Sequence, residues 1–135
     1  MVTPGIFKAY DIRGIYPVEL NNETALEIGW GLGRFFGKTG RAKVVVARDG
    51  RIGSPELYRA VIEGLRSANG KVRIVEVGLA TTPMFYVLVQ LLKATGGIIV
   101  TASHNPREWN GFKVVGQNAE MIGGREVLKI ITNNL

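Results

Sequence analysis

The fold is indicated by the segment 44–100, which begins with Val44-Val45-Val46-Ala47 and ends with Gly97-Ile98-Ile99-Val100. A third apolar run, Val72 to Val77, lies between these two. All three runs are short, rich in β-branched residues and bounded by Gly, Asn or charged residues, which is typical of strands buried on both faces. Because helical patterns separate the runs, the segment predicts parallel strands joined by right-handed helical crossovers.

Three helices are predicted around these strands, each from apolar residues at three-to-four spacing. The first covers about 22–38. Start and stop signals bound the helices. Gly40 follows the first helix as a stop. The second helix starts with Ser54 as N-cap and Pro55 and stops at Asn69-Gly70, and the third starts at Thr82-Pro83 and stops at Gly96.

The pattern changes after Val100. A polar loop covers 101–110, Asn110-Gly111 is a turn signal, and Phe112 and Val114 indicate one or two antiparallel strands. The range 126–133 predicts a short final helix. Together these elements predict an α/β fold, a three-layer sandwich with a mostly parallel mixed sheet and helices on both faces.

The composition bounds the function classes. A chain of 135 residues with 46% hydrophobic residues can form one domain with a sizeable core. It has no Cys and one His, which excludes disulfides, thiolate metal sites and His-rich metal clusters. The net charge of +6 favours anionic partners. Neither a basic arm nor an apolar stretch of about 18 residues is present, so we expect a cytoplasmic protein without nucleic-acid or membrane partners.

The loop after Val100 is the candidate site, because ligands of open α/β sheets bind beyond the carboxyl ends of the strands. It contains Ser103, His104 and Asn105, and Pro106 restricts the backbone of Asn105. The residues alone leave two interpretations open. One is a hydroxyl nucleophile beside an imidazole; the other, favoured by spacing alone, is a polar turn whose side chains bond to the backbone.

Three segments resemble one enzyme family. The first is Thr101-Ala102-Ser103-His104-Asn105-Pro106, with Trp109-Asn110-Gly111-Phe112-Lys113 after it. It closely resembles the active-site loop of the α-D-phosphohexomutases, the phosphomannomutase and phosphoglucomutase family. Tyr10-Asp11-Ile12-Arg13-Gly14 resembles a segment near the family's amino terminus, and the range 48–54 resembles its loop after the second strand. The three segments occur in the family's order, so the resemblance covers essentially the whole chain.

The resemblance implies that Ser103 carries a phosphoryl group and exchanges it with a hexose 1- or 6-phosphate, through a hexose 1,6-bisphosphate. The sequence does not choose between mannose and glucose phosphates. Arg13, His104 and Lys113 match family positions near that phosphate, and cations there would neutralise its charge of about −1.5 to −2. Arg13 and Lys113 would also bind phosphate. His104 either orients or protonates the transferred group or is a structural residue, and both interpretations stay open.

Two further residues complete the predicted site. Tyr10 and Asn105 are assigned to phosphate or substrate binding and to shaping the loop, by the same resemblance. The family holds Mg²⁺ with a loop of aspartates and an oxygen of the phosphoserine. This sequence has only two aspartates, Asp11 and Asp49, and they are too far apart in the sequence to form that loop. Ser103, through its phosphate, is therefore the one metal ligand predicted here.

The resemblance also implies that 1–135 is domain I of a four-domain enzyme. The family's metal loop, sugar-recognition loop and carboxyl-terminal phosphate loop have no counterpart in this sequence. We therefore expect the remaining domains of the parent enzyme to be partners of this chain. We also expect the isolated chain to be inactive as a mutase.

Alternative functions remain. One is a non-catalytic anion-binding or regulatory module. Another is a serine hydrolase using Ser103 and His104, which lacks a third triad member and the G-x-S-x-G motif. The glycines of 29–33 depart from a nucleotide-binding spacing and indicate close helix packing instead. Asp49 and Arg51 are predicted to hold their own loop, or to lie at the edge of the cleft.

Overall fold

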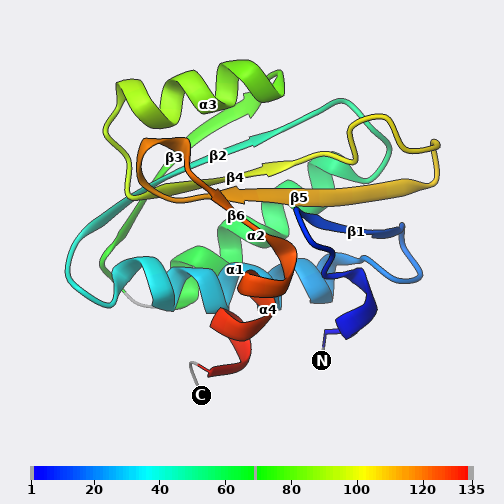
Figure 1. Ribbon diagram of the computed structural model, residues 1–135, viewed down its shortest axis with the longest axis horizontal. Helices are drawn as coiled ribbons and strands as arrows, with labels where there is room; N and C mark the ends of the chain where they lie inside the picture. The colour runs from blue at the N-terminus through cyan, green and yellow to red at the C-terminus, as the bar shows by residue number, and fades with distance from the viewer. Residues whose placement is uncertain (1, 69, 134–135) are drawn as a thin grey trace.

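The computed structural model describes residues 2–68 and 70–133, which form a mixed sheet between two helical layers (Figure 1). The strands are β1 (Ile12–Ile15), β2 (Ala42–Arg48), β3 (Val72–Leu79), β4 (Gly96–Val100), β5 (Trp109–Val115) and β6 (Met121–Ile122). The helices are α1 (Asn22–Gly37), α2 (Ser54–Ala68), α3 (Thr82–Leu91) and α4 (Gly124–Asn133), with short 3₁₀ turns η1 (Pro4–Ile6) and η2 (Gln117–Ala119). This architecture confirms the predicted α/β sandwich.

The sheet has the order β1-β5-β4-β2-β3, and β6 also pairs with β5. The strands β2, β3 and β4 are mutually parallel, whereas β5 is antiparallel to β4, β1 and β6. Phe112 of β5 pairs with both Val100 of β4 and Ile12 of β1. Since β4 ends at Val100, the start of β5 and the rest of β1 extend beyond it. The loop that follows β4 therefore lies beside β1.

Two hydrophobic cores hold the layers together. Helices α1, α2 and α4 cover one face and α3 covers the other, as Figure 1 shows. The larger core joins α1 and α2 to the sheet through fully buried residues such as Ile28, Leu57 and Ile98. The smaller core packs Phe85 and Val89 of α3 against the opposite face. All five residues of β4 are buried, which is the expected environment of a central parallel strand.

Helices α1 and α2 pack with almost no space between their backbones. A Cβ atom on Gly29 would overlap the carbonyl oxygen of Val61, and one on Gly64 would overlap that of Leu26. A Cβ on Gly31 would overlap Ile131 of α4. The prediction that the glycines of 29–33 serve helix packing is confirmed. Among the described residues, no helix has the length and apolar character needed to cross a bilayer.

Several local predictions were wrong. Asn110-Gly111 is part of β5 rather than a turn, and a Cβ on Gly111 would overlap the carbonyl oxygen of Ile12 in β1. Gly96 does not end the third helix but begins β4. Ser54 is the first residue of α2, and its hydroxyl donates to Asp49 instead of capping the helix.

Other boundaries were close to the prediction. Helix α1 ends one residue before the expected Lys38, and α4 begins at Gly124, two residues earlier than expected. The N-cap of α3 is Thr81, whose side chain accepts a hydrogen bond from the backbone N–H of Met84. The stop signal Asn69-Gly70 begins at a residue outside the described ranges.

Candidate functional site

The loop after β4 is shaped by its own polar side chains. The backbone N–H of Ser103 donates to the Thr101 hydroxyl at 3.0 Å. Both the backbone N–H and the side-chain amide of Asn105 donate to the carbonyl of Ala102, at 3.1 and 3.0 Å. These bonds agree with the polar-turn interpretation for Thr101 and Asn105. The Asn105 side chain thus contributes to the shape of the loop, and its role in phosphate or substrate binding stays a prediction.

Ser103 differs from its neighbours in two respects. Its φ of +55° lies in the left-handed region, which is uncommon outside glycine and has to be held by surrounding structure. Its side chain is half-buried, and its hydroxyl makes no hydrogen bond with any other described residue. Serine side chains in turns can bond to nearby backbone groups, as the Thr101 hydroxyl does here. The hydroxyl of Ser103 is instead left available to a ligand.

Arg51 holds the main chain of this loop from outside. Its Nη2 donates to the carbonyl oxygens of Ser103 and Asn105, both at 2.7 Å. Its Nη1 donates to those of Pro106 and Trp109, at 2.8 and 3.1 Å. The planar guanidinium thus satisfies four carbonyls of one turn, a geometry that the single ammonium of lysine does not reproduce. Arg51 fixes the backbone on both sides of His104.

A chain of polar contacts orients Arg51 in turn. The Asp49 carboxylate accepts a hydrogen bond from the backbone N–H of Arg51 at 3.1 Å and lies 3.6 Å from its Nε. The Ser54 hydroxyl donates to Asp49 at 2.6 Å and accepts from the side-chain amide of Asn110 at 3.0 Å. Because Asn110 is fully buried, this chain connects the loop to the interior of the sheet. Asp49 and Arg51 do hold their own loop, as predicted, and Arg51 reaches the next loop as well.

A second charged cluster joins β5 to the residues before β1. Asp11 is only 4% exposed, and its Oδ2 accepts hydrogen bonds from Arg13 Nε at 2.7 Å and Lys113 Nζ at 3.3 Å. Two cations therefore share one buried carboxylate, which leaves a formal charge of +1. Both cations are partly exposed. Their remaining N–H groups are thus accessible to an anionic ligand.

A hollow of about 410 Å³ brings several of the predicted residues together. It is lined by Lys8, Ala9, Tyr10, Asp11, Arg13, Asn105 and Trp109. The structure therefore places Tyr10, Arg13 and Asn105 around one space. Lys113 is connected to that space through Asp11, whereas Ser103 and His104 are outside its lining. The Tyr10 ring is 70% exposed and makes no hydrogen bond within the described residues.

His104 is exposed, and no hydrogen bond joins its imidazole to the Ser103 hydroxyl in the part of the chain that the structure describes. Neighbouring residues on this turn do not form the serine–base pair that nucleophilic hydrolysis uses. The arrangement gives the serine hydrolase alternative no support.

Three residues of this region were not recognised as site residues in the sequence. From the sequence, Asp11 has no predicted site role beyond its place in the segment 10–14, Arg51 has a predicted place in its own loop or at the edge of the cleft, and Lys8 has no predicted role. The one signal for Asp11 was its place between Tyr10 and Arg13. Nothing in the sequence indicates that Arg51 reaches residues more than fifty positions away, since this contact depends on how β2 and β4 pair.

The described residues do not fit a magnesium ion. Mg²⁺ prefers several oxygen ligands in an octahedral arrangement. No group of three or more His, Asp or Glu side chains with suitable placement occurs in the described ranges. Asp11 is engaged by two cations, and Asp49 by Arg51 and Ser54. Both carboxylates are thus already paired with basic side chains.

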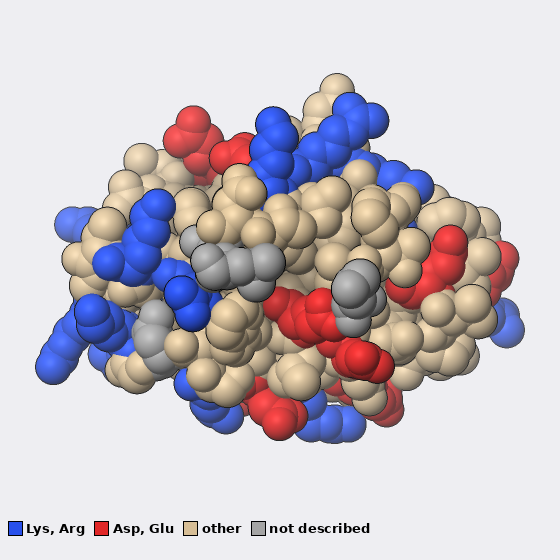
Figure 2. All heavy atoms as spheres, turned by 90° about the horizontal axis from the view of Figure 1, so that it is seen from below, with Lys and Arg blue, Asp and Glu red and all other residues tan. Residues whose placement is uncertain are grey.

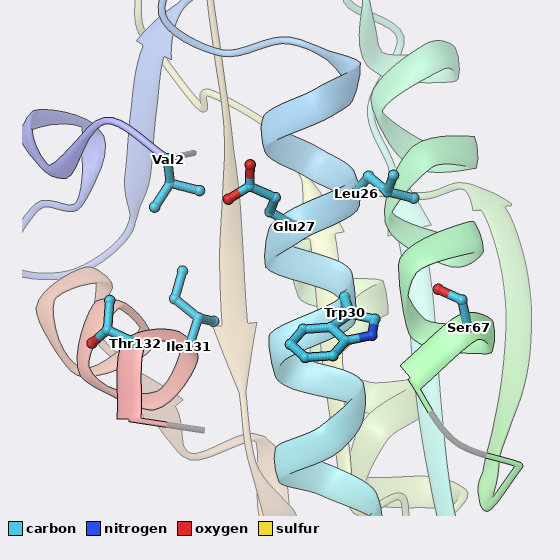
Figure 3. A pocket seen from close by; sticks show the side chains of 7 residues that line it. All are labelled: Val2, Leu26, Glu27, Trp30, Ser67, Ile131 and Thr132. Carbon is cyan, nitrogen blue, oxygen red and sulfur yellow. The ribbon is translucent and has the colours of Figure 1, made fainter. Parts of the chain in front are cut away.

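A larger hollow of about 620 Å³ lies between α1, α2 and α4 (Figure 3). Leu26, Trp30 and Ile131 line it together with Glu27, and no Lys or Arg is among its described lining residues. An apolar lining with a carboxylate and no cation does not suit a phosphate-bearing ligand. The charged region at the carboxyl end of β4 is the candidate site.

Comparison with known proteins identifies the family of the chain. Residues 4–134 match the family model described as phosphoglucomutase/phosphomannomutase, alpha/beta/alpha domain I. A phosphomannomutase of Escherichia coli is 44% identical over 125 residues, which are 93% of this chain and 26% of that protein. A phosphomannomutase/phosphoglucomutase of Pseudomonas syringae is 43% identical over 110 residues, or 82% and 23% of the two chains.

Solved structures show the same fold. The crystal structure of a phosphoglucomutase/phosphomannomutase family protein from Burkholderia thailandensis superposes with a TM-score of 0.86 and 37% identity. The match covers 100% of this chain and 31% of that one. The chain therefore spans about a quarter of the length of the curated relatives it matches.

Proposed function

Because the chain belongs to the phosphoglucomutase/phosphomannomutase family and matches its domain I, we propose that Ser103 carries the phosphoryl group of a cytoplasmic phosphohexomutase. One observation carries this assignment. The backbone of Ser103 is held in a left-handed conformation by the Arg51 contacts, while its hydroxyl has no partner among the described residues. A fixed backbone with an uncommitted hydroxyl suits a group that must be positioned for transfer.

The proposed reaction exchanges one phosphoryl group between two oxygens. The P–O bond to Ser103 Oγ breaks as a new P–O bond forms to a hydroxyl of a hexose monophosphate. The hydroxyl's proton passes to a base, and Ser103 regains a proton to become an alcohol. The other phosphate of the resulting 1,6-bisphosphate then returns to Ser103, so that the net change moves phosphate between C1 and C6. Lys113 and His104 are the candidate proton carriers.

Charge in the site favours a phosphorylated Ser103. A phosphoserine brings about −1.5 to −2 charges near neutral pH. The cluster of Asp11, Arg13 and Lys113 carries +1, and Lys8 on the same hollow adds another positive charge. Arg13 can bind two phosphate oxygens with its planar fork, and Lys113 acts as a point charge. We assign phosphate binding to Arg13 and Lys113, with Tyr10 and Asn105 at the edge of the same space.

The remaining parts of the reaction are assigned to a longer chain. The described residues offer no magnesium site, so carboxylate ligands for a metal would come from elsewhere, with a phosphate on Ser103 completing the set. Selection of mannose or glucose phosphates is assigned to the same additional parts. We expect the purified 135-residue chain to show no interconversion of mannose 6-phosphate and mannose 1-phosphate. Turnover by that chain alone would contradict this division of roles.

A chimera tests the proposal. Residues 4–134 replace the matching segment of the Escherichia coli relative, with which this chain shares 44% identity. The chimera is expected to interconvert hexose 1- and 6-phosphates and to gain about 80 Da on Ser103 from hexose 1,6-bisphosphate. Ser103→Ala should abolish both, whereas Ser67→Ala on α2 should change neither. Full turnover in the Ser103→Ala chimera would instead favour the non-catalytic anion-binding module.

A further inference from the structure

A second charged hollow lies at the opposite end of the parallel strands from Ser103. It has a volume of about 490 Å³ and is formed where the chain enters β2, β3 and β4. Five of its lining residues are basic and none is acidic: Arg41, Lys43, Lys71, Arg73 and Lys93. Two of them, Lys43 and Arg73, are directly paired in register on the adjacent strands β2 and β3. Like charges at paired positions destabilise a sheet, so folding alone does not account for this arrangement.

Only part of this charge has a structural role. Lys43 Nζ donates to the carbonyl of Leu92 at 3.1 Å, where a cation is favourable beside the carboxyl end of α3. The side chains of Arg41, Arg73 and Lys93 make no hydrogen bond or ion pair with other described residues. Positive charge on the edge strand β3 also discourages pairing with another sheet. Protection of a sheet edge explains Arg73, which lies on β3. It does not explain Arg41 or Lys93, because these residues precede the inner strands β2 and β4.

The five cations make up most of the excess charge of the molecule. The formal net charge is +6, so removing five positive charges would leave +1. Figure 2 shows Lys and Arg side chains gathered at its left end, the end at which the chain enters β2 and β3 in Figure 1. Other Lys and Arg side chains lie along the top and bottom of the same view, so the hollow is distinguished by five cations without an acidic residue in its lining.

We propose that this hollow binds a small anion with several neighbouring phosphate groups, such as an inorganic polyphosphate or a nucleoside triphosphate. The cations come from three separate turns around one concave surface, so adjacent phosphates of one ligand can contact several of them together. A single phosphate would reach fewer, and a nucleic acid strand needs a longer basic track than this hollow provides. The arginines add paired N–H donors that match phosphate oxygens.

Thr95 gives the hollow a neutral donor. Its hydroxyl oxygen accepts a hydrogen bond from the backbone N–H of Lys43 at 3.2 Å, which leaves the hydroxyl proton for a ligand. This polyphosphate site is separate from the Ser103 site. Thr95 and Thr101 flank β4, and six residue steps along a strand span about 20 Å. The inference does not depend on the proposed mutase function.

The test is a titration of the ¹⁵N-labelled 135-residue chain with inorganic tripolyphosphate. Saturable amide shifts are expected in 40–43, 70–73 and 93–95, at least tenfold tighter than with orthophosphate. The double variant Arg73→Gln, Lys93→Gln should weaken binding at least tenfold. The matched control Arg59→Gln, Lys129→Gln removes the same charge from exposed positions elsewhere and should change binding less than twofold. Because all four side chains are exposed, the variants should keep the fold, and dispersed amide spectra would verify this.

Four outcomes would overturn the proposal. Equal weakening in the two double variants would mean that net charge alone attracts the anion. Shifts confined to 101–108 would place tripolyphosphate at the Ser103 loop instead. Equal affinity for orthophosphate and tripolyphosphate would show that the hollow does not bind several phosphate groups of one ligand together. Tighter binding of a single-stranded oligonucleotide would identify a nucleic-acid surface. A parallel titration with ATP distinguishes a nucleotide ligand from a polyphosphate. If the hollow also contacts the base, ATP should bind more tightly than tripolyphosphate.

Discussion

The guanidinium of Arg51 and the main-chain carbonyl of Ser103 are joined by a 2.7 Å hydrogen bond, although 52 positions separate the two residues. The same guanidinium reaches three further carbonyls of the turn. The loop after β4 is therefore held by the loop after β2 as well as by its own polar side chains. This relationship places Arg51 in a positioning role for Ser103.

Replacing Arg51 by lysine keeps the charge and removes the fork. We expect Arg51→Lys to lower the free energy of unfolding by about 2 kcal/mol, because several charge-assisted hydrogen bonds to partly buried carbonyls are lost. Amide hydrogen exchange in 101–109 should rise with it. Arg59→Lys serves as control, since Arg59 is exposed and contacts only Glu56, at 3.9 Å. Unchanged exchange in the loop of Arg51→Lys would show that the side chains of the loop suffice to hold it.

Asp11→Asn leaves Arg13 and Lys113 side by side without a counter-charge. We expect a loss of about 2 kcal/mol in unfolding free energy, less than for a fully buried pair because both cations are partly exposed. Inorganic phosphate should restore part of the loss by binding to the freed cations. Urea unfolding with and without phosphate measures both effects. Glu63→Gln, an exposed change on α2, should be neutral, and an equal loss there would remove the special role of Asp11.

Asn110→Ala breaks the buried link between β5 and the loop after β2. The Asn110 side chain donates to Ser54 and to the carbonyl of Ile52, and it accepts from the backbone N–H of Gly111. Losing these bonds in a fully buried position should cost about 2 to 3 kcal/mol. Chemical denaturation checks the value. The control Gln117→Ala changes an exposed residue and should lower the unfolding free energy by less than about 0.5 kcal/mol, as ordinary surface substitutions do.

Tyr58 gives the stability a dependence on alkaline pH. Burial raises the pKa of Tyr58 above its ordinary value, and its hydroxyl oxygen accepts a hydrogen bond from the backbone N–H of Gly78. In the unfolded chain the phenol ionises near pH 10, whereas in the folded chain it stays neutral to higher pH. Its contribution to stability is therefore complete below about pH 10 and is lost as the pH rises toward the folded pKa.

Tyr58→Phe tests this dependence. The variant should lose about 1 kcal/mol near neutral pH, because the hydrogen bond to Gly78 is gone. Above pH 10 its stability should fall less steeply than that of the original chain. Thermal unfolding from pH 8 to 11 measures the slope, with the exposed Tyr10→Phe as control. Identical slopes in the original chain and in Tyr58→Phe would contradict the assignment.

The sequence was sufficient for the main elements of the fold. The short apolar runs predict β2, β3 and β4, because a strand buried on both faces requires such a run. The three-to-four spacing of apolar residues predicts the intervening helices, because a helix that buries one stripe requires that spacing. The same reasoning failed at β1 and at Asn110-Gly111. The four-residue strand β1 is too short for a periodic signal, and an Asn-Gly pair is a turn signal by its local preference alone. In the structure, β1 packs so closely against Gly111 that only glycine fits there.

What the sequence by itself determined is the order of strands and helices from α1 to β4 and the polar loop after β4, whereas the site around Ser103 is a prediction from the family resemblance. The tertiary structure alone decided that Asp11 joins Arg13 to Lys113, that Arg51 holds the turn of Ser103, and that five cations from three turns surround one hollow. The physical reason is the range of the interactions. Periodicity and local preference act over a few residues, whereas these contacts join positions that only strand pairing brings together.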